Sequence, residues 1–138
     1  FRPDRTALGK LYYFYRDRAV VESAKFIGVR YVAELEGEAA HKGGAEAASL
    51  WDQASGVYAY LGDTRKAAAC ARTAVHHAAD DFGLHQRLAA ALMQNHEYDE
   101  AVSQLQWCLS RQPEDTSLQQ QLEQANRQRL TSPGVIVR

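Results

Sequence analysis

Proline, glycine and cysteine are scarce in this chain of 138 residues, which has three prolines, nine glycines and two cysteines. Few helix breakers, together with plentiful Ala, Leu, Gln, Glu and Arg, favour an all-α fold. Cys70 and Cys108 lack the spacing of a zinc or redox motif, so we expect two small buried thiols in a reducing compartment. A disulfide between them stays open at this level.

Long apolar runs are also missing. No segment approaches the roughly 20 apolar residues that a membrane span needs, and no secretory signal peptide is visible. The chain begins with Phe1 rather than methionine, so we expect a fragment or a processed product whose upstream signal or anchor could have been removed. We therefore expect no membrane insertion by this segment, and a cytoplasmic location only by default.

A large excess of one charge sign is absent as well. The formal net charge is −1, which gives no global basic surface for nucleic acid or acidic membranes. The distribution is uneven, because residues 1–33 hold seven Lys or Arg against three Asp or Glu. This basic end alone is nonspecific, so we expect no nucleic-acid partner.

Catalytic signatures are lacking too. The chain has no GxSxG, HExxH or P-loop, and its serines have no evident His–Asp partners. A cluster of His76, His77, Asp80 and Asp81 has ligand types that suit a metal, but histidine at a helix C-terminus is also favoured by the helix dipole. We expect no enzyme activity, no metal and no cofactor.

A pattern that recurs after 34 residues is the main feature that is present. Trp51 is matched by His85, and Gly62 by His96. A period of this length is typical of helix–turn–helix repeats. The other matched pairs are Ala54 and Leu88, Tyr58 and Leu92, Ala67 and Ala101, Ala74 and Cys108, and Ala79 and Pro113.

These two segments resemble the tetratricopeptide repeat, whose pattern runs from Trp through Leu-Gly, Tyr and Ala-x3-Phe to Pro. The first segment departs from it at Ala71 and Ala79, where Phe and Pro are usual, and the second at His85 and His96. The first supplies Trp51, Ala54–Ser55, Tyr58, Gly62, Ala67 and Ala71, and the second supplies Leu88–Ala89, Leu92, Tyr98, Ala101, Leu105 and Pro113.

The resemblance implies an α-solenoid of antiparallel helix pairs with a concave face that binds a peptide or helix of another protein. The residue set that would line this groove is neutral and partly apolar. The Lys, Arg and Asn clamp with which some family members hold a C-terminal carboxylate is missing here. The implied groove residues are Ser49, Asp52, Gly56, Ala59, Tyr60, Gly83, Gln86, Ala90, Met93 and Gln94.

The repeats divide the chain into five parts. Residues 45–81 and 82–115 are the two repeats, 116–130 a capping helix and 131–138 a short tail. Residues 1–44 are expected to form a helical extension, either one long helix or two helices broken near 16–18, with Gly28 as another weak point. A degenerate earlier repeat, in which the same period places Gly28 under Gly62, is the alternative.

Aromatic residues outside the repeat pattern suggest a second contact surface. Tyr12, Tyr13, Phe14 and Tyr15 cannot all face one side of a helix, so at least one must point away from the first core. Trp107 points away from the face of its own helix that carries the apolar residues. Either the last helix or the tail covers Trp107, or it is an exposed anchor for a partner.

The function that these features favour is a protein-interaction adaptor or scaffold, whose partner the sequence does not identify. The alternative is a structural module that forms a homodimer through its aromatic N-terminal helices. The groove hypothesis gives weight to Tyr60 and Met93, and the dimer hypothesis to residues 12–15.

Overall fold

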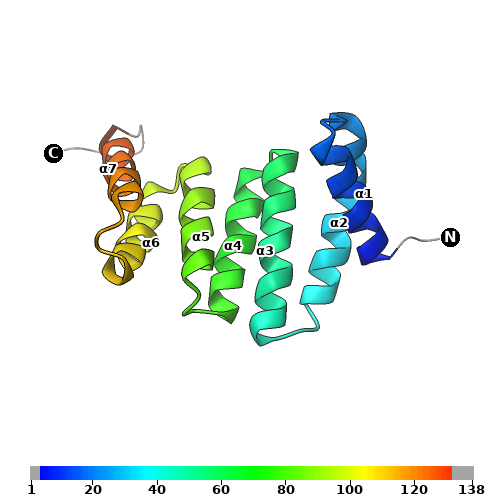
Figure 1. Ribbon diagram of the computed structural model, residues 1–138, viewed down its shortest axis with the longest axis horizontal. Coiled ribbons are helices and arrows are strands. Elements are labelled where there is room, and N and C mark those ends of the chain that lie inside the picture. The colour runs from blue at the N-terminus through cyan, green and yellow to red at the C-terminus, as the bar shows by residue number, and fades with distance from the viewer. Residues whose placement is uncertain (1–3, 132–138) are drawn as a thin grey trace. The chain divides into compact units, whose positions relative to one another are not determined.

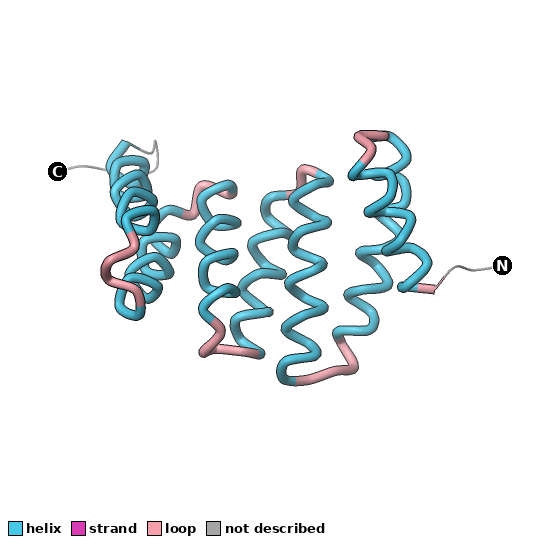
Figure 2. The backbone as a smooth tube through the Cα atoms, viewed as in Figure 1, coloured by secondary structure: helices cyan, strands magenta, loops and turns pink. Residues whose placement is uncertain are grey.

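The computed structural model describes residues 4–131, which fold into helices only. The seven helices of this part of the chain are α1 (Arg5–Asp17), α2 (Val21–Ala39), α3 (Gly44–Leu61), α4 (Thr64–His77), α5 (Phe82–Gln94), α6 (Tyr98–Arg111) and α7 (Thr116–Thr131) (Figures 1 and 2). The all-α prediction is confirmed. The predicted tail lies almost entirely outside the described residues.

The chain divides into two compact units, Phe1–Ala78 and Ala79–Arg138, called unit 1 and unit 2 below. In unit 1, α2 packs against α1 and α3, and α3 packs against α4. In unit 2, α6 packs against both α5 and α7. Each unit has its own buried cluster of apolar side chains.

The N-terminal third is a pair of helices, which settles the alternative between one long helix and two. The break falls after Asp17, as expected near 16–18. Gly28 is not a break: it lies inside α2, where an added Cβ would come within 3.3 Å of the Tyr12 and Leu61 side chains. Its missing side chain allows close packing, so the 34-residue register that paired it with Gly62 is wrong here.

The first helix of each helix pair ends in the same turn. Ala19, Gly62 and His96 all adopt positive φ, at 57°, 85° and 60°. In each turn the next N–H group bonds to a carbonyl five residues back, at 2.9–3.0 Å, which is a Schellman cap. The donor and acceptor pairs are Val20 and Tyr15, Asp63 and Tyr58, and Glu97 and Leu92.

Aspartate begins four of the helices. Asp4, Asp63, Asp81 and Asp115 each accept a hydrogen bond from the backbone N–H three residues on, at 2.8–3.1 Å. Such a cap satisfies one of the N–H groups that the first turn leaves unpaired.

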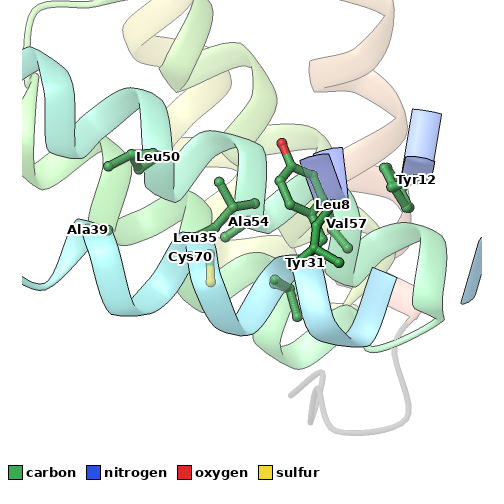
Figure 3. Packing of buried hydrophobic residues seen from close by; sticks show 10 residues of the cluster. Leu8, Tyr12, Tyr31, Leu35, Ala39, Leu50, Ala54, Val57 and Cys70 are labelled. Carbon is green, nitrogen blue, oxygen red and sulfur yellow. The ribbon is translucent and has the colours of Figure 1, made fainter. Parts of the chain in front are cut away.

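The core of unit 1 is built around tyrosines. The Tyr12 side chain is 1% exposed, and its ring centroid lies 5.6 Å from that of Tyr31 and 5.7 Å from that of Tyr60. Tyr12 is therefore a core residue and is not available to another chain, whereas its neighbour Phe14 is 47% exposed. Figure 3 shows Tyr12 and Tyr31 with the aliphatic members of this cluster.

Small residues bring α3 and α4 of unit 1 close together. Ala67, Ala68, Ala71 and Ala74 are all buried on α4. The Ser55 hydroxyl on α3 donates to the Ala67 carbonyl oxygen at 2.8 Å, so this buried polar group is satisfied. The small side chains of α4 thus allow the axes of α3 and α4 to approach closely.

The core of unit 2 is aliphatic. Leu88 and Leu92 of α5, Leu105 of α6 and Leu118 of α7 are all at most 1% exposed. Cys108 is buried in one cluster with Leu105 and Leu118, and burial raises the pKa of its thiol. Cys70 is buried in unit 1, and both cysteines are free thiols.

Candidate functional site

The predicted groove residues on α3 form one accessible stripe of unit 1. Ser49, Gly56 and Ala59 are exposed, and Asp52 and Tyr60 are half-buried. Their spacing of three or four residues places them on the side of α3 away from the buried Ala47, Leu50, Ala54 and Val57.

The α3 stripe is tied to α2 by a short chain of hydrogen bonds that sequence patterns did not indicate. The Tyr31 hydroxyl donates to Gln53 Oε1, and Gln53 Nε2 donates to Ser49 Oγ, both at 3.2 Å. The Tyr60 ring, also in the stripe, meets the buried Tyr12 ring edge to face. The stripe is therefore a pre-organised surface, with its side chains held before any partner binds.

The predicted residues of unit 2 separate into two groups. Ala90, Met93 and Gln94 line a pocket of about 250 Å³, with Ala89 beside them. Gly83 and Gln86, nearer the start of α5, do not line it. The α3 and α5 residues that were assigned to one groove belong to different units of the chain.

Four residues of this pocket were not among the predicted groove residues: Ala89 from α5, Leu105 from α6, and Gln121 and Gln124 from α7. Gln94, Gln121 and Gln124 give the pocket three amide side chains, while Met93 and Leu105 supply apolar surface. No lining residue is charged, so the pocket suits an uncharged apolar group flanked by peptide-like donors and acceptors.

A second pocket, in unit 1, has a different character. It measures about 240 Å³ and is lined by Glu36, Trp51, Tyr58, Lys66, Ala69, Cys70 and Thr73. The Tyr58 hydroxyl donates to the Glu36 carboxylate, and the Lys66 ammonium lies 5.5 Å from the Tyr58 ring centroid. Burial raises the pKa of Cys70 to about 12, so its thiol stays protonated at neutral pH and is a poor nucleophile.

Trp107 is partly buried and packs against a cluster that includes Leu118 and Ala125 of α7, while the tail that was the other predicted cover lies outside the described residues. Its ring stacks on the His85 imidazole, with centroids 3.6 Å apart and planes 15° apart. The Arg111 guanidinium also lies 3.6 Å from the Trp107 centroid, and two groups that close must occupy opposite faces of the ring. The half-buried Trp107 is therefore the centre of a three-layer stack, not a free anchor.

His85 has a structural role that the sequence pattern did not indicate. It stands where the repeat pattern has Trp, and it is only 6% exposed. Its Nδ1 lies 2.6 Å from Gln104 Oε1, and its Nε2 lies 2.6 Å from the Ala79 carbonyl oxygen. The imidazole thus links the start of unit 2 to α6, which is a structural role.

The His76, His77, Asp80 and Asp81 cluster is not arranged as a metal site. Asp81 caps α5, and the rings of His76 and His77 meet edge to face with centroids 5.7 Å apart. Within residues 4–131, no group of three or more His, Cys, Asp or Glu side chains could hold a metal ion.

Comparison with known proteins adds no assignment: no protein-family model matches the chain, and no curated protein matches it. Among the described helices, none is long and apolar enough to cross a membrane. The sites above therefore rest on their own geometry.

Proposed function

We propose that this chain is a helical repeat protein of the tetratricopeptide type that binds a peptide or helix of another protein. The 34-residue spacing of the turns at Gly62 and His96 supports the repeat assignment, since both residues close a Schellman cap at matched positions. Repeat proteins of this type are stacks of helix pairs such as α3–α4 and α5–α6.

The single observation that carries the binding proposal is the neutral pocket around Met93. An apolar side chain of the partner would enter between Met93 and Leu105, and the amides of Gln94, Gln121 and Gln124 would bond its main chain. The α3 stripe of unit 1 is a separate candidate contact area, more polar through Ser49 and Asp52. Because the lining of the Met93 pocket is uncharged, we expect a partner there to be held mainly by apolar burial.

A random peptide library tests this proposal without a known partner. The full chain is the bait, enriched peptides are synthesised, and their affinities are measured by fluorescence anisotropy. We expect Met93→Glu to weaken binding by roughly tenfold or more, because it places a charge in the neutral pocket. Tyr60→Ala tests the α3 stripe separately and should weaken only those enriched peptides that bind unit 1.

The control is Leu130→Glu, which introduces the same carboxylate at an exposed apolar residue of α7 that does not line the pocket. It should leave affinity unchanged. If the enriched peptides bind Met93→Glu and Tyr60→Ala as tightly as the original chain, the proposed site is wrong.

A further inference from the structure

Exposed apolar side chains gather at the N-terminal helix pair. Seven large apolar residues of the described chain are exposed, and six of them lie between Leu11 and Val29. Phe26 is 62% exposed and Val29 59% exposed, both on α2 (Figure 1). An apolar concentration of this kind on one helix pair marks an interaction surface more often than scattered exposure does.

Several side chains of α1 and α2 gather around a hollow. The Phe14 and Tyr15 rings meet edge to face with centroids 5.4 Å apart. Tyr15 then lines a pocket of about 380 Å³ together with Glu22, Ser23, Phe26 and Ile27. We call Phe14, Tyr15, Phe26, Ile27 and Val29 the N-terminal patch.

Basic side chains cover and border the patch. The Arg18 guanidinium lies 3.9 Å from the Phe14 ring centroid, and that of Arg30 lies 4.8 Å from the Phe26 centroid. Lys25 is exposed next to Phe26. A guanidinium that stacks through its face keeps its N–H donors in its plane, where they can still bind a carboxylate.

Acidic groups near the patch are fewer. Asp17 pairs with Arg16 at 3.0 Å, Glu22 lies in the pocket wall, and Glu34 follows Arg30 one turn later on α2, against the three cations Arg18, Lys25 and Arg30. The border of the patch is therefore net positive. An incoming surface must bring apolar side chains for the rings and negative charge for the two arginines.

We propose that the N-terminal patch binds an acidic amphipathic segment of a partner protein. An apolar side chain of that segment fills the pocket between Tyr15 and Phe26, and its carboxylates pair with Arg18 and Arg30. This goes beyond the proposed function, because none of these residues belongs to the α3 stripe or to the Met93 pocket.

Two other occupants fit the patch less well. A second copy of the chain in a two-fold contact would bring its own Arg18 and Arg30 against the same positive border. An anionic lipid surface would meet Glu22 in the pocket wall and would leave the hollow unfilled. An acidic amphipathic segment does both: its carboxylates pair with the arginines, and its apolar side chain fills the hollow.

Three synthetic amphipathic peptides test the proposal by fluorescence anisotropy with the full chain. The first has Leu on one helical face and Glu on the rest, the second replaces Glu by Lys, and the third keeps Glu but replaces Leu by Ser. We expect saturable binding of the Leu–Glu peptide alone, weakened several-fold by added salt. Phe26→Ser should weaken it at least about fivefold, and Arg30→Glu more.

Leu130→Ser and Arg127→Glu are the matched controls, because they make the same chemical changes at exposed positions of α7. Circular dichroism checks that every variant is folded. Unchanged affinity of Phe26→Ser and Arg30→Glu, or equal binding of the Lys peptide, would overturn the proposal. So would binding of anionic vesicles in place of the peptide, or a dimer in light scattering that Phe26→Ser dissolves.

Discussion

The two units contain the same kind of helix pair, but their cores consist of different residue types. Unit 1 surrounds Tyr12 with further tyrosine rings, whereas unit 2 packs leucines and covers Trp107 with His85 and Arg111. Both use a Schellman cap after the first helix of a pair. The difference teaches that turn chemistry specifies the helix pair, while the core needs only suitable volume and satisfied polar groups.

The largest expected effect is the loss of the tyrosine core. Tyr12→Ala should destabilise unit 1 by about 3–5 kcal/mol, since it removes a buried aromatic ring and leaves a cavity. Each unit holds one tryptophan, Trp51 or Trp107, so single-Trp variants report on the two units separately during urea unfolding. Phe14→Ala, at an exposed position, should cost less than about 1 kcal/mol.

If the comparison holds, the Trp51 transition shifts in Tyr12→Ala more than the Trp107 transition does. Equal shifts of both transitions would show that the two cores unfold as one cooperative body and that the comparison has no thermodynamic meaning.

The next effect concerns the stack in unit 2. His85→Ala should cost about 2–3 kcal/mol, because it leaves the Ala79 carbonyl and Gln104 without their imidazole partner and uncovers one face of Trp107. The urea midpoint followed by Trp107 fluorescence measures the loss. His41→Ala, at an exposed position of unit 1, is the control and should shift the midpoint little. A similar loss in both variants would contradict a specific stabilising role of His85.

Alkaline pH should destabilise unit 1 more than unit 2. Burial raises the pKa of Tyr31 to about 12 and that of Cys70 to about 12, and it also raises the pKa of Tyr12, all in unit 1. The unfolded chain releases these protons first, near pH 9–10, so stability is full below that range and falls as pH rises towards 12.

Unit 1 should therefore lose more than about 1 kcal/mol between pH 8.5 and 10.5, measured by the Trp51 urea transition. Cys70→Ala should flatten this dependence. Unit 2, where Cys108 is the buried thiol, should lose less. A steeper alkaline loss in the Trp107 transition would reverse the comparison.

The smallest effect tests the turns. Ala19 adopts a left-handed conformation, so Ala19→Gly should stabilise unit 1 by about 1 kcal/mol. Ala33→Gly, exposed within α2, should destabilise by about 1 kcal/mol because the backbone there is helical. Thermal unfolding compares the pair, and stabilisation by both or by neither would contradict the assigned turn.

The boundaries of α3 to α6 were predictable from sequence because their signals are local. Gly62 ends α3, and Asp63 caps α4. The pair α3–α4 spans residues 44–77 and the pair α5–α6 spans 82–111, close to the segments 45–81 and 82–115 that the 34-residue pattern delimits. Side-chain exposure on α3 also followed from helical spacing alone.

The N-terminal third was less predictable for a physical reason. Its turn residue is alanine, which gives no glycine signal, and 43 residues separate Ala19 from Gly62. The long helices α2 and α3, with 19 and 18 residues, account for the larger spacing. A search at a fixed period of 34 could not find this third turn.

The candidate sites were only partly predictable. Ala90, Met93 and Gln94 were assigned from one helix, but the pocket also needs Gln121 and Gln124 from α7, which a repeat pattern does not contain. His85 and Trp107 are 22 positions apart, and nothing in their spacing indicates that their rings stack. Contacts between helices depend on packing that one-dimensional patterns do not encode.

The aspartate caps and Schellman turns set the helix ends one at a time. Within residues 63–96, Asp63 and Asp81 cap the starts of α4 and α5, and His96 closes the turn after α5. A substitution at one of these positions should therefore move one helix end and leave the others in place.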